Sequence, residues 1–316
     1  MNEIARIAVL IPCYNEEAAI AKVVQDFRAA LPMADIYVYD NNSKDGTAAR
    51  AKQAGAIVRQ EMNRGKGSVV RRMFADIEAD IYVLVDGDDT YDASFAPLLV
   101  RALIDQGLDL VSGRRIAVAD AAYRAGHRLG NRMLTGLTAA MFRVKLADLL
   151  TGYRVLSRRF VKSFPFTAEG FGIETELTVH AVRLLMPMVE IDTCYKERPA
   201  GSVSKLNTWR DGFRILLTIL ALVREERPFI FFTTLFVVLA AFSLLIGTPV
   251  VLEYLRTGLV PRLPTAVLAT GLMVLAFLSL ASGLILDTVT RGRWEFKRVA
   301  YLAISGPHGL KLPRDA

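Results

Sequence analysis

Three aspartates lie within four positions at the end of an apolar run, and they are the strongest chemical signal in the chain. Asp86, Asp88 and Asp89 follow residues 81–85, which have the composition of a buried strand. Carboxylates this close repel one another and raise one another's pKa. A divalent cation with oxygen ligands relieves the repulsion, especially where phosphate supplies the remaining ligands. The sequence therefore predicts a cation site at this strand end.

An EF-hand loop and a solvated turn are two other structures in which aspartates cluster like this. A calcium-binding EF-hand loop requires a third oxygen ligand and a glycine at the positions held by Thr90 and Tyr91, so it is excluded. A solvated acidic turn stays open at this point, because Asp and Gly are common in turns. The motifs elsewhere in the chain distinguish a cation site from a solvated turn.

Short apolar runs that alternate with longer amphipathic segments predict an α/β fold with a mostly parallel sheet. The expected strands are residues 7–11, 36–39, 57–58 and 81–85, and the expected helices are residues 18–31, 47–54 and 67–79. Ligands of such sheets bind beyond the carboxyl ends of the strands. Polar clusters follow three of these strands, at residues 14–17, 40–45 and 86–89, and we expect them to meet in one crevice.

Named phosphate loops are absent. No G-x-G-x-x-G follows the first expected strand, and residues 64–68 (RGKGS) lack the spacing of a Walker A loop. This basic, Gly-rich entrance to a helix can still attract phosphate through its backbone N–H groups. A simple turn explains it equally well.

Four motifs occur in a fixed order: IPCYNEE at 11–17, DNNSKDGT at 40–47, NRGKG at 63–67 and DGD at 86–88. Together they resemble the family 2 glycosyltransferases, which have the GT-A fold, a Rossmann-like, mostly parallel α/β arrangement. Asp148 with TGYR at 151–154, GFGIETE at 170–176 and RPAGSVSKL at 198–206 look like the polyprenyl-phosphate branch, which includes dolichol-phosphate mannose synthase and undecaprenyl-phosphate glucosyltransferase. The resemblance spans about residues 5 to 210.

The resemblance implies a nucleotide-sugar donor and a divalent cation, Mg²⁺ or Mn²⁺, held by Asp86 and Asp88. Residues implied for the donor are Pro12, Tyr14, Asn15, Glu16, Asp40, Asn42, Lys66, Asp86 and Gly87. Asn15 could instead cap a helix, and both roles can hold at once. Relatives often carry Gln near the positions of Asp89 and Thr90, so this chain departs from the family pattern there.

The implied acceptor is a polyprenyl phosphate. Residues implied for its phosphate are Arg114, Arg128, Arg132, Thr151, Arg154, Arg198, Ser204 and Lys205, and the implied catalytic set is Asp86, Asp88, Arg114 and Arg128. Glu174 or Glu176 would orient the sugar hydroxyls, or else form a polar helix face. The charge pattern alone also fits a solvated face for Arg124, Arg128 and Arg132. A phosphate monoester has a second pKa near 6, so the expected inverting attack needs no general base.

Two segments carry no charged residue, 228–252 and 263–286. Each is long enough to cross a hydrocarbon core of roughly 30 Å, and we predict two transmembrane helices; buried core helices are the alternative. Basic residues flank the pair, and the N-terminus lacks a signal peptide pattern, which predicts a multi-pass protein of the cytoplasmic (inner) membrane with a cytoplasmic active site. The expected order is a catalytic domain at 1–206, an amphipathic interface helix at 207–227 (or a domain-packing helix), the two spans and a cytoplasmic basic tail at 287–316.

Composition agrees with a lipid-bilayer partner. Hydrophobic residues make up 53% of the chain, and the net charge of +7 suits an anionic membrane surface or phosphorylated ligands. Dispersed basic residues without a binding motif argue against nucleic acid. Cys13 and Cys194 are too few for a disulfide framework. A homo-oligomer stays open.

Two other functions compete with this one. A processive polysaccharide synthase usually carries a Gln/Arg-x-x-Arg-Trp motif before several spans, but the similar string at 291–294 follows the last expected span and lacks the first residue. A non-catalytic sugar-nucleotide-binding scaffold is the second rival. The intact set Asp86, Asp88, Arg114 and Lys205 argues against it.

Overall fold

The computed structural model describes residues 4–117, 135–136, 138–140, 146–165, 172–196, 217 and 220–311. The chain forms two compact units, which are described separately. The first contains Met1–Ile215 and Lys297–Ala316, and the second contains Leu216–Phe296. The first unit carries the sheet, and the second carries the long apolar helices.

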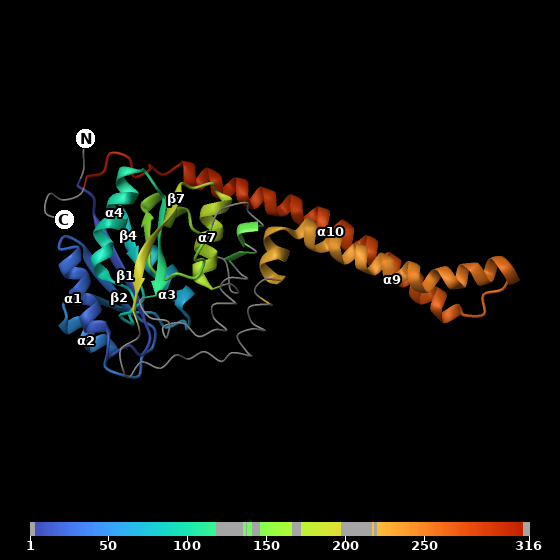
Figure 1. The fold of residues 1–316 in the computed structure, drawn as a ribbon, viewed down its shortest axis with the longest axis horizontal. Coiled ribbons are helices and arrows are strands. Elements are labelled where there is room, and N and C mark those ends of the chain that lie inside the picture. The colour runs from blue at the N-terminus through green and yellow to red at the C-terminus, as the bar shows by residue number, and fades with distance from the viewer. Residues whose placement is uncertain are drawn as a thin grey trace. The chain divides into compact units, whose positions relative to one another are not determined.

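A seven-stranded sheet forms the centre of the first unit, with the strand order β3-β2-β1-β4-β6-β5-β7. Figure 1 labels four of its strands, β1, β2, β4 and β7. Its strands are β1 (Ile7–Cys13), β2 (Asp35–Asp40), β3 (Ile57–Gln60), β4 (Ile81–Leu84), β5 (Leu110–Ala117), β6 (Arg154–Ser157) and β7 (Met188–Tyr195). All neighbouring pairs are parallel except those that β6 makes with β4 and β5. The predicted mostly parallel α/β sheet is confirmed.

Amphipathic helices cover the sheet. They are α1 (Ile20–Ala30), α2 (Thr47–Gln53), α3 (Lys66–Asp76), α4 (Ala96–Asp105), α6 (Arg158–Ser163) and α7 (Ile173–Arg183), with a short 3-10 turn at Ala93–Phe95 before α4. Helix α1 contacts α2 and α4, whereas α3 contacts α6 and α7. The buried residues of α1 are Ile20, Val23, Val24 and Phe27, the spacing of one helix face turned to a core.

The strand register brings the polar clusters to one edge. Cys13 at the end of β1 lies beside Asp40 at the end of β2. Leu10 pairs with Leu84 at the end of β4, and Val85 N–H donates to Leu10 O at 3.0 Å. The loops that leave β1, β2 and β4 therefore start close together, as ligand sites of parallel sheets require.

The last described residues return to the first unit. Helix α10 (Leu263–Leu302) ends at Leu302, and Ala5 N–H donates to Lys311 O at 2.9 Å. Residues Lys297–Ala316 belong to the first unit, and they form most of the stretch that the sequence predicts to be a cytoplasmic basic tail, 287–316. The physical reason is long-range packing: Tyr301 is buried against this unit.

The second unit contains two long helices, α9 (Pro228–Thr257) and most of α10. Ser243 Oγ donates to Ala269 O at 2.7 Å and Ser279 Oγ donates to Phe232 O at 3.1 Å, so the helices run antiparallel. Both are long and apolar enough to cross a membrane, and their most apolar stretches are only 6% and 22% buried. This exposure disfavours the core-helix alternative. Of the expected interface helix at 207–227, residues 220–226 are helical and most of the rest lies outside the described residues.

Candidate active site

The loops after β1 and β2 are joined by hydrogen bonds. Asn15 Oδ1 accepts from Lys44 N–H at 2.8 Å, and Asn15 N–H donates to Ser43 Oγ at 2.9 Å. Glu16 N–H donates to Thr47 Oγ1 at 2.9 Å. Helix α1 begins later, at Ile20, and no side chain caps it. The interpretation of Asn15 as a helix cap is therefore wrong; its amide fixes the neighbouring loop.

Asp40 carries an unsatisfied acceptor. The residue is 2% exposed, and its Oδ2 accepts from Ser43 N–H at 3.1 Å. Its Oδ1 is buried and has no hydrogen-bond partner among the residues that the structure describes. Buried polar atoms in native proteins are nearly always paired, so this oxygen is available to accept a hydrogen bond from a water molecule or a ligand. Pro12 in β1 and the 44% exposed Tyr14 lie at the same edge.

Two asparagines hold the loop that leads into α3. Asn42, at φ 63°, donates from Nδ2 to Met62 O at 2.9 Å. Asn41 Oδ1 accepts from Gly65 N–H at 2.8 Å, and Gly65 adopts φ 112°, a conformation that favours glycine. These bonds use the Asn42 amide within the protein and fix the position from which Lys66 starts.

Lys66 joins two carboxylates at the centre of the site. Its Nζ forms ion pairs with Asp86 Oδ1 and, at 2.6 Å, with Glu174 Oε1. Partial burial raises the pKa of Asp86, and Lys66 only partly opposes this. Burial would also raise the pKa of Glu174, but the Lys66 ammonium outweighs it and the pKa is lowered. Burial would lower the pKa of Lys66, yet the two carboxylates raise it, so the lysine stays charged.

The residues that depart from the family pattern have local roles. Thr90 Oγ1 donates to Asp88 Oδ1 at 2.6 Å, and Asp88 is 5% exposed. Asp89 adopts φ 56° and pairs with Lys22 at 2.9 Å. Thr90 thus orients Asp88, while Asp89 is turned toward α1.

The oxygen donors fit a cation that arrives with phosphate. Asp86 and Asp88 offer hard carboxylate oxygens, the ligand type that Mg²⁺ and Mn²⁺ prefer. Within the described residues, no group of three or more His, Cys, Asp or Glu could hold a metal by itself. Mg²⁺ typically binds through one or two carboxylates plus substrate phosphates, and this donor set matches that case.

Glycines allow close approach on both sides of this strand end. A Cβ on Gly87 would lie 2.6 Å from Cys13 Sγ, and a Cβ on Gly152 would overlap with the Asp86 carboxylate. Burial, followed by Glu16, raises the pKa of the Cys13 thiol, which keeps it protonated and unreactive. Cys13 and Cys194 are both free cysteines, as the sequence predicts.

The loop before β6 is held from within. Arg154 is 0% exposed, and its guanidinium donates to Leu149 O at 2.8 Å, to Thr151 O at 3.1 Å and to Thr178 Oγ1 at 2.9 Å. Thr151, also 0% exposed, donates from Oγ1 to Gly113 O at 2.6 Å. This burial argues against direct contact of either side chain with an acceptor phosphate. Both instead position the loop that carries Gly152.

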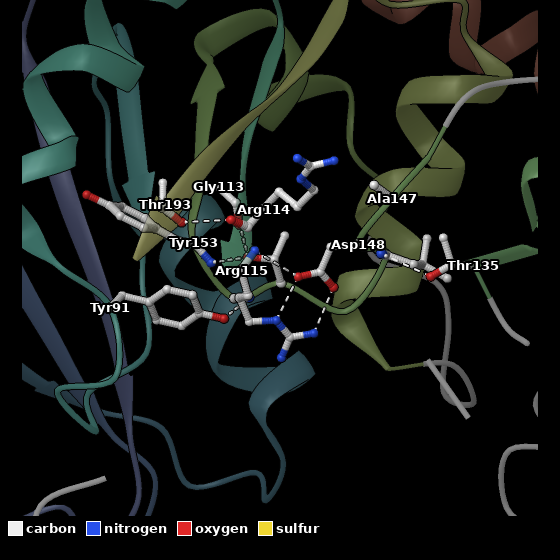
Figure 2. A network of polar contacts seen from close by, with 12 residues as sticks. Tyr91, Gly113, Arg114, Arg115, Thr135, Ala147, Asp148, Tyr153 and Thr193 are labelled. Atoms are coloured by element: carbon white, nitrogen blue, oxygen red, sulfur yellow. Dashed lines mark hydrogen bonds and ion pairs between the residues drawn. The ribbon is translucent and has the colours of Figure 1, made fainter. Parts of the chain in front are cut away.

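Two consecutive arginines leave β5 in opposite directions, as successive strand residues do (Figure 2). Arg114 pairs with Asp192 on β7, with Nη2 at 2.6 Å from Oδ2. Arg115 donates from Nε and Nη2 to the two oxygens of Asp148, both at 2.7 Å, and lies over the Tyr195 ring at 5.5 Å. The sequence interpretation missed Arg115. The alternation of sides along a strand could have indicated that only one of the two faces any given ligand.

The acidic residues of α7 are both engaged. Glu174 pairs with Lys66, and Glu176 Oε1 lies 3.5 Å from Arg71 Nη2 on α3. Their side chains are 18% and 8% exposed, which disfavours a merely solvated helix face. Five residues implied for the acceptor or catalysis lie outside the described residues: Arg128, Arg132, Arg198, Ser204 and Lys205.

Comparison with known proteins gives the family. The sequence profile described as Glycosyl transferase family 2 matches residues 8–164. Glycosyltransferase AglJ of Haloferax volcanii is 35% identical over 228 residues, 72% of this chain and 75% of the relative. Dolichyl-phosphate hexose transferase of the same organism is 30% identical over 222 residues, 70% of this chain and 95% of the relative.

A solved structure agrees with the fold. Glucosyl-3-phosphoglycerate synthase of Mycobacterium tuberculosis is 25% identical, with a TM-score of 0.56, over 69% of this chain and 80% of that chain. The chain belongs to glycosyl transferase family 2, and its first unit has the GT-A fold. It is a glycosyltransferase. We expect its chemistry at the edge of the sheet where β1, β2 and β4 end.

Proposed function

We propose that this glycosyltransferase moves a hexose from a UDP- or GDP-sugar to the phosphate of a polyprenyl phosphate, undecaprenyl or dolichyl. The product is a lipid-linked monosaccharide for glycan assembly. One observation carries the proposal. The chain combines a GT-A unit, with Asp86 and Asp88 after the end of β4, and two apolar helices that are long enough to span a bilayer. The relative named dolichyl-phosphate hexose transferase supports the same acceptor class.

At the donor end, the unpaired Oδ1 of Asp40 accepts an N–H of the base or a ribose hydroxyl. Pro12, Tyr14, Asn15 and Glu16 line this part of the site, and Gly87 leaves room beside the diphosphate. Asp86 and Asp88 would hold Mg²⁺ or Mn²⁺, and the bound cation would supply positive charge against the departing diphosphate. Glu174 and Glu176 are assigned to the sugar, and Asn42 supports the nearby loop.

At the acceptor end, a phosphate oxygen attacks the anomeric carbon while the bond from that carbon to the diphosphate oxygen breaks. The electron pair of that bond leaves with the nucleoside diphosphate, and the anomeric configuration inverts. The acceptor is mostly dianionic at neutral pH, so no side chain has to remove a proton. We assign Arg114, Arg128, Arg132, Arg198, Ser204 and Lys205 to the acceptor phosphate, and Thr151 and Arg154 to loop positioning.

The proposed setting is the cytoplasmic face of the inner membrane. The helices α9 and α10 anchor the protein as two spans, and residues 207–227 lie at the headgroup level. Basic residues on both sides of the helix pair, such as Arg224 and Arg291, favour this orientation. Self-association through the spans is compatible with this arrangement.

The test is a transfer assay with detergent-purified full-length protein. It contains labelled nucleotide-sugars, Mg²⁺ or Mn²⁺, and polyprenyl phosphate, and the expected product is label in an organic-extractable lipid. Asp88→Asn should abolish transfer while thermal unfolding stays cooperative. Water-soluble polymer would instead indicate a processive synthase, and nucleotide binding without any product would indicate a scaffold.

A further inference from the structure

The ammonium of Lys66 forms an ion pair with Asp86, one of the two carboxylates assigned to the divalent cation. Its Nζ contacts Asp86 Oδ1, and the same nitrogen reaches Glu174 Oε1 at 2.6 Å. In the part of the chain that the structure describes, no other cation lies within ion-pair distance of these two carboxylates. Among the described residues, Lys66 is therefore the cation that compensates the charge of Asp86.

Asp86 and Glu174 share the single ammonium of Lys66. A third carboxylate, Asp88, lies two residues from Asp86. A second cation is favoured there, but Lys66 already occupies one oxygen of Asp86.

The geometry lets the ammonium move without the backbone. Lys66 is the first residue of α3, and the loop before it is fixed by the bond from Gly65 N–H to Asn41 Oδ1. The Lys66 side chain is 31% exposed, and its four-carbon stem carries three rotatable N–H donors. A diphosphate at this edge would offer the ammonium a new anionic partner.

We propose that Lys66 and the divalent cation are exchangeable occupants of Asp86. In the unloaded protein the ammonium holds the carboxylate. When the cation arrives with a nucleoside diphosphate, Lys66 leaves Asp86 and pairs with the phosphate. This inference rests on the proposed nucleotide-sugar chemistry of the same site.

The exchange couples the two ligands. Cation alone has to displace Lys66 from Asp86, which weakens its binding. Nucleotide gives the displaced ammonium a partner, so each ligand strengthens the binding of the other by the same factor. Free Mn²⁺ or Mg²⁺ should therefore bind poorly until a diphosphate is present.

The test measures Mn²⁺ binding to the full-length protein in detergent by electron paramagnetic resonance, without and with UDP or GDP. Lys66→Met and Lys66→Gln remove the charge, and Lys66→Arg keeps it. Lys22→Met is the matched control, because Lys22 pairs with Asp89 at 2.9 Å on the same strand end, and Asp89 is not assigned to the cation. Thermal unfolding confirms that each variant is folded.

Without nucleotide, we expect the two neutral Lys66 variants to bind Mn²⁺ at least about tenfold more tightly than wild type. The enhancement by nucleotide should shrink by a similar factor, while Lys66→Arg and Lys22→Met stay within about threefold of wild type. If the folded neutral variants bind Mn²⁺ no more tightly than wild type, or if Lys66→Arg binds as tightly as they do, the exchange is refuted. Failure of the transfer assay would refute the proposed function instead, because Mn²⁺ binding does not require turnover.

Discussion

Two carboxylates of the first unit, Asp86 and Asp109, are both paired with cations, but their surroundings differ. Asp109 is 0% exposed and accepts four hydrogen bonds: from Ser157 Oγ at 2.6 Å, from Arg159 Nε and Nη2 at 3.0 and 2.7 Å, and from Tyr301 Oη at 2.8 Å. The Arg159 guanidinium also lies 4.4 Å from the centre of the Tyr301 ring. Every donor is supplied by the protein, so Asp109 has no capacity left for a ligand.

Asp86 has the opposite surroundings. Its side chain is 29% exposed, and it shares one ammonium with Glu174 while Asp88 lies two residues away. A carboxylate with a full set of protein donors holds segments together, as Asp109 does for β6 and the end of α10. A carboxylate that is short of donors and crowded by like charges can take up a ligand. Ion pairing alone therefore does not identify a functional site; the balance of donors and charges does.

Removing each carboxylate should give opposite results. Asp109→Ala removes the fully buried acceptor of these hydrogen bonds and leaves the Arg159 guanidinium, whose side chain is only 17% exposed, without its partner. We expect a loss of about 3–5 kcal/mol in the free energy of unfolding. Asp86→Asn relieves repulsion, so the free energy of unfolding should change by no more than about 1 kcal/mol, while sugar transfer is lost. Denaturant unfolding and the transfer assay on the same preparations give both quantities.

The contrast would break if the two variants lost similar stability, or if Asp86→Asn kept transfer at the wild-type rate. Asp26→Asn is a suitable control, since this carboxylate makes an exposed pair with Lys22 on α1. Exposed pairs of this kind contribute about 0–1 kcal/mol, so the control should be nearly silent in both measurements.

The donor half of the site could be predicted from sequence because its information is local. Apolar runs give the strands β1, β2 and β4, and polar residues directly after them must lie at one edge of a parallel sheet. The Gly-rich segment at 64–68 predicts a helix start, and this places Lys66 at the beginning of α3. Even there, the partners of Asp89 and Thr90 were not predictable, because both depend on the φ of 56° at Asp89.

The other half depends on pairings far apart in the chain. Strand β6 pairs antiparallel with β4 and with β5 and so joins two parallel groups of strands. No local sequence pattern predicts this antiparallel pairing. Asp109 and Tyr301 are 192 residues apart, so spacing carries no signal of their contact. Arg154 looks like a phosphate ligand in a motif, but its complete burial follows from packing between β6 and α7. Local pattern shows which residues can do chemistry, and only the fold shows which of them are already occupied.

His180 on α7 is a buried titratable group that, like Asp109, is enclosed by the protein. Its Nε2 lies 3.1 Å from Ser163 Oγ, and its ring contacts those of Phe160 and Phe164. Burial, with a smaller effect of Lys297, lowers the pKa of His180 to about 3. This folded pKa lies below the unfolded value near 6.5, so the contribution to stability is complete above pH 6.5 and is lost as the pH falls toward 3.

The expected loss is about 1.4 kcal/mol per pH unit below 6.5, or about 2 kcal/mol at pH 5. His180→Gln keeps a polar group near Ser163 but cannot take up the proton. We expect the free energy of unfolding of this variant to fall by about 2 kcal/mol less than that of wild type between pH 7 and pH 5. Equal pH dependence in the two proteins would show that His180 is not kept neutral by the fold.

Tyr301→Phe should give the smallest effect. The variant removes one of four donors to Asp109 and keeps the ring beside Arg159, so the free energy of unfolding should fall by about 1 kcal/mol. Tyr254→Phe on α9, where the tyrosine is 51% exposed, is the matched control and should change nothing measurable. A loss as large as that of Asp109→Ala would mean that the other donors to Asp109 contribute little without the Tyr301 hydroxyl. An effect near 1 kcal/mol with unchanged sugar transfer would instead show that three remaining donors still satisfy Asp109, and that this carboxylate serves the fold while Asp86 serves the ligand.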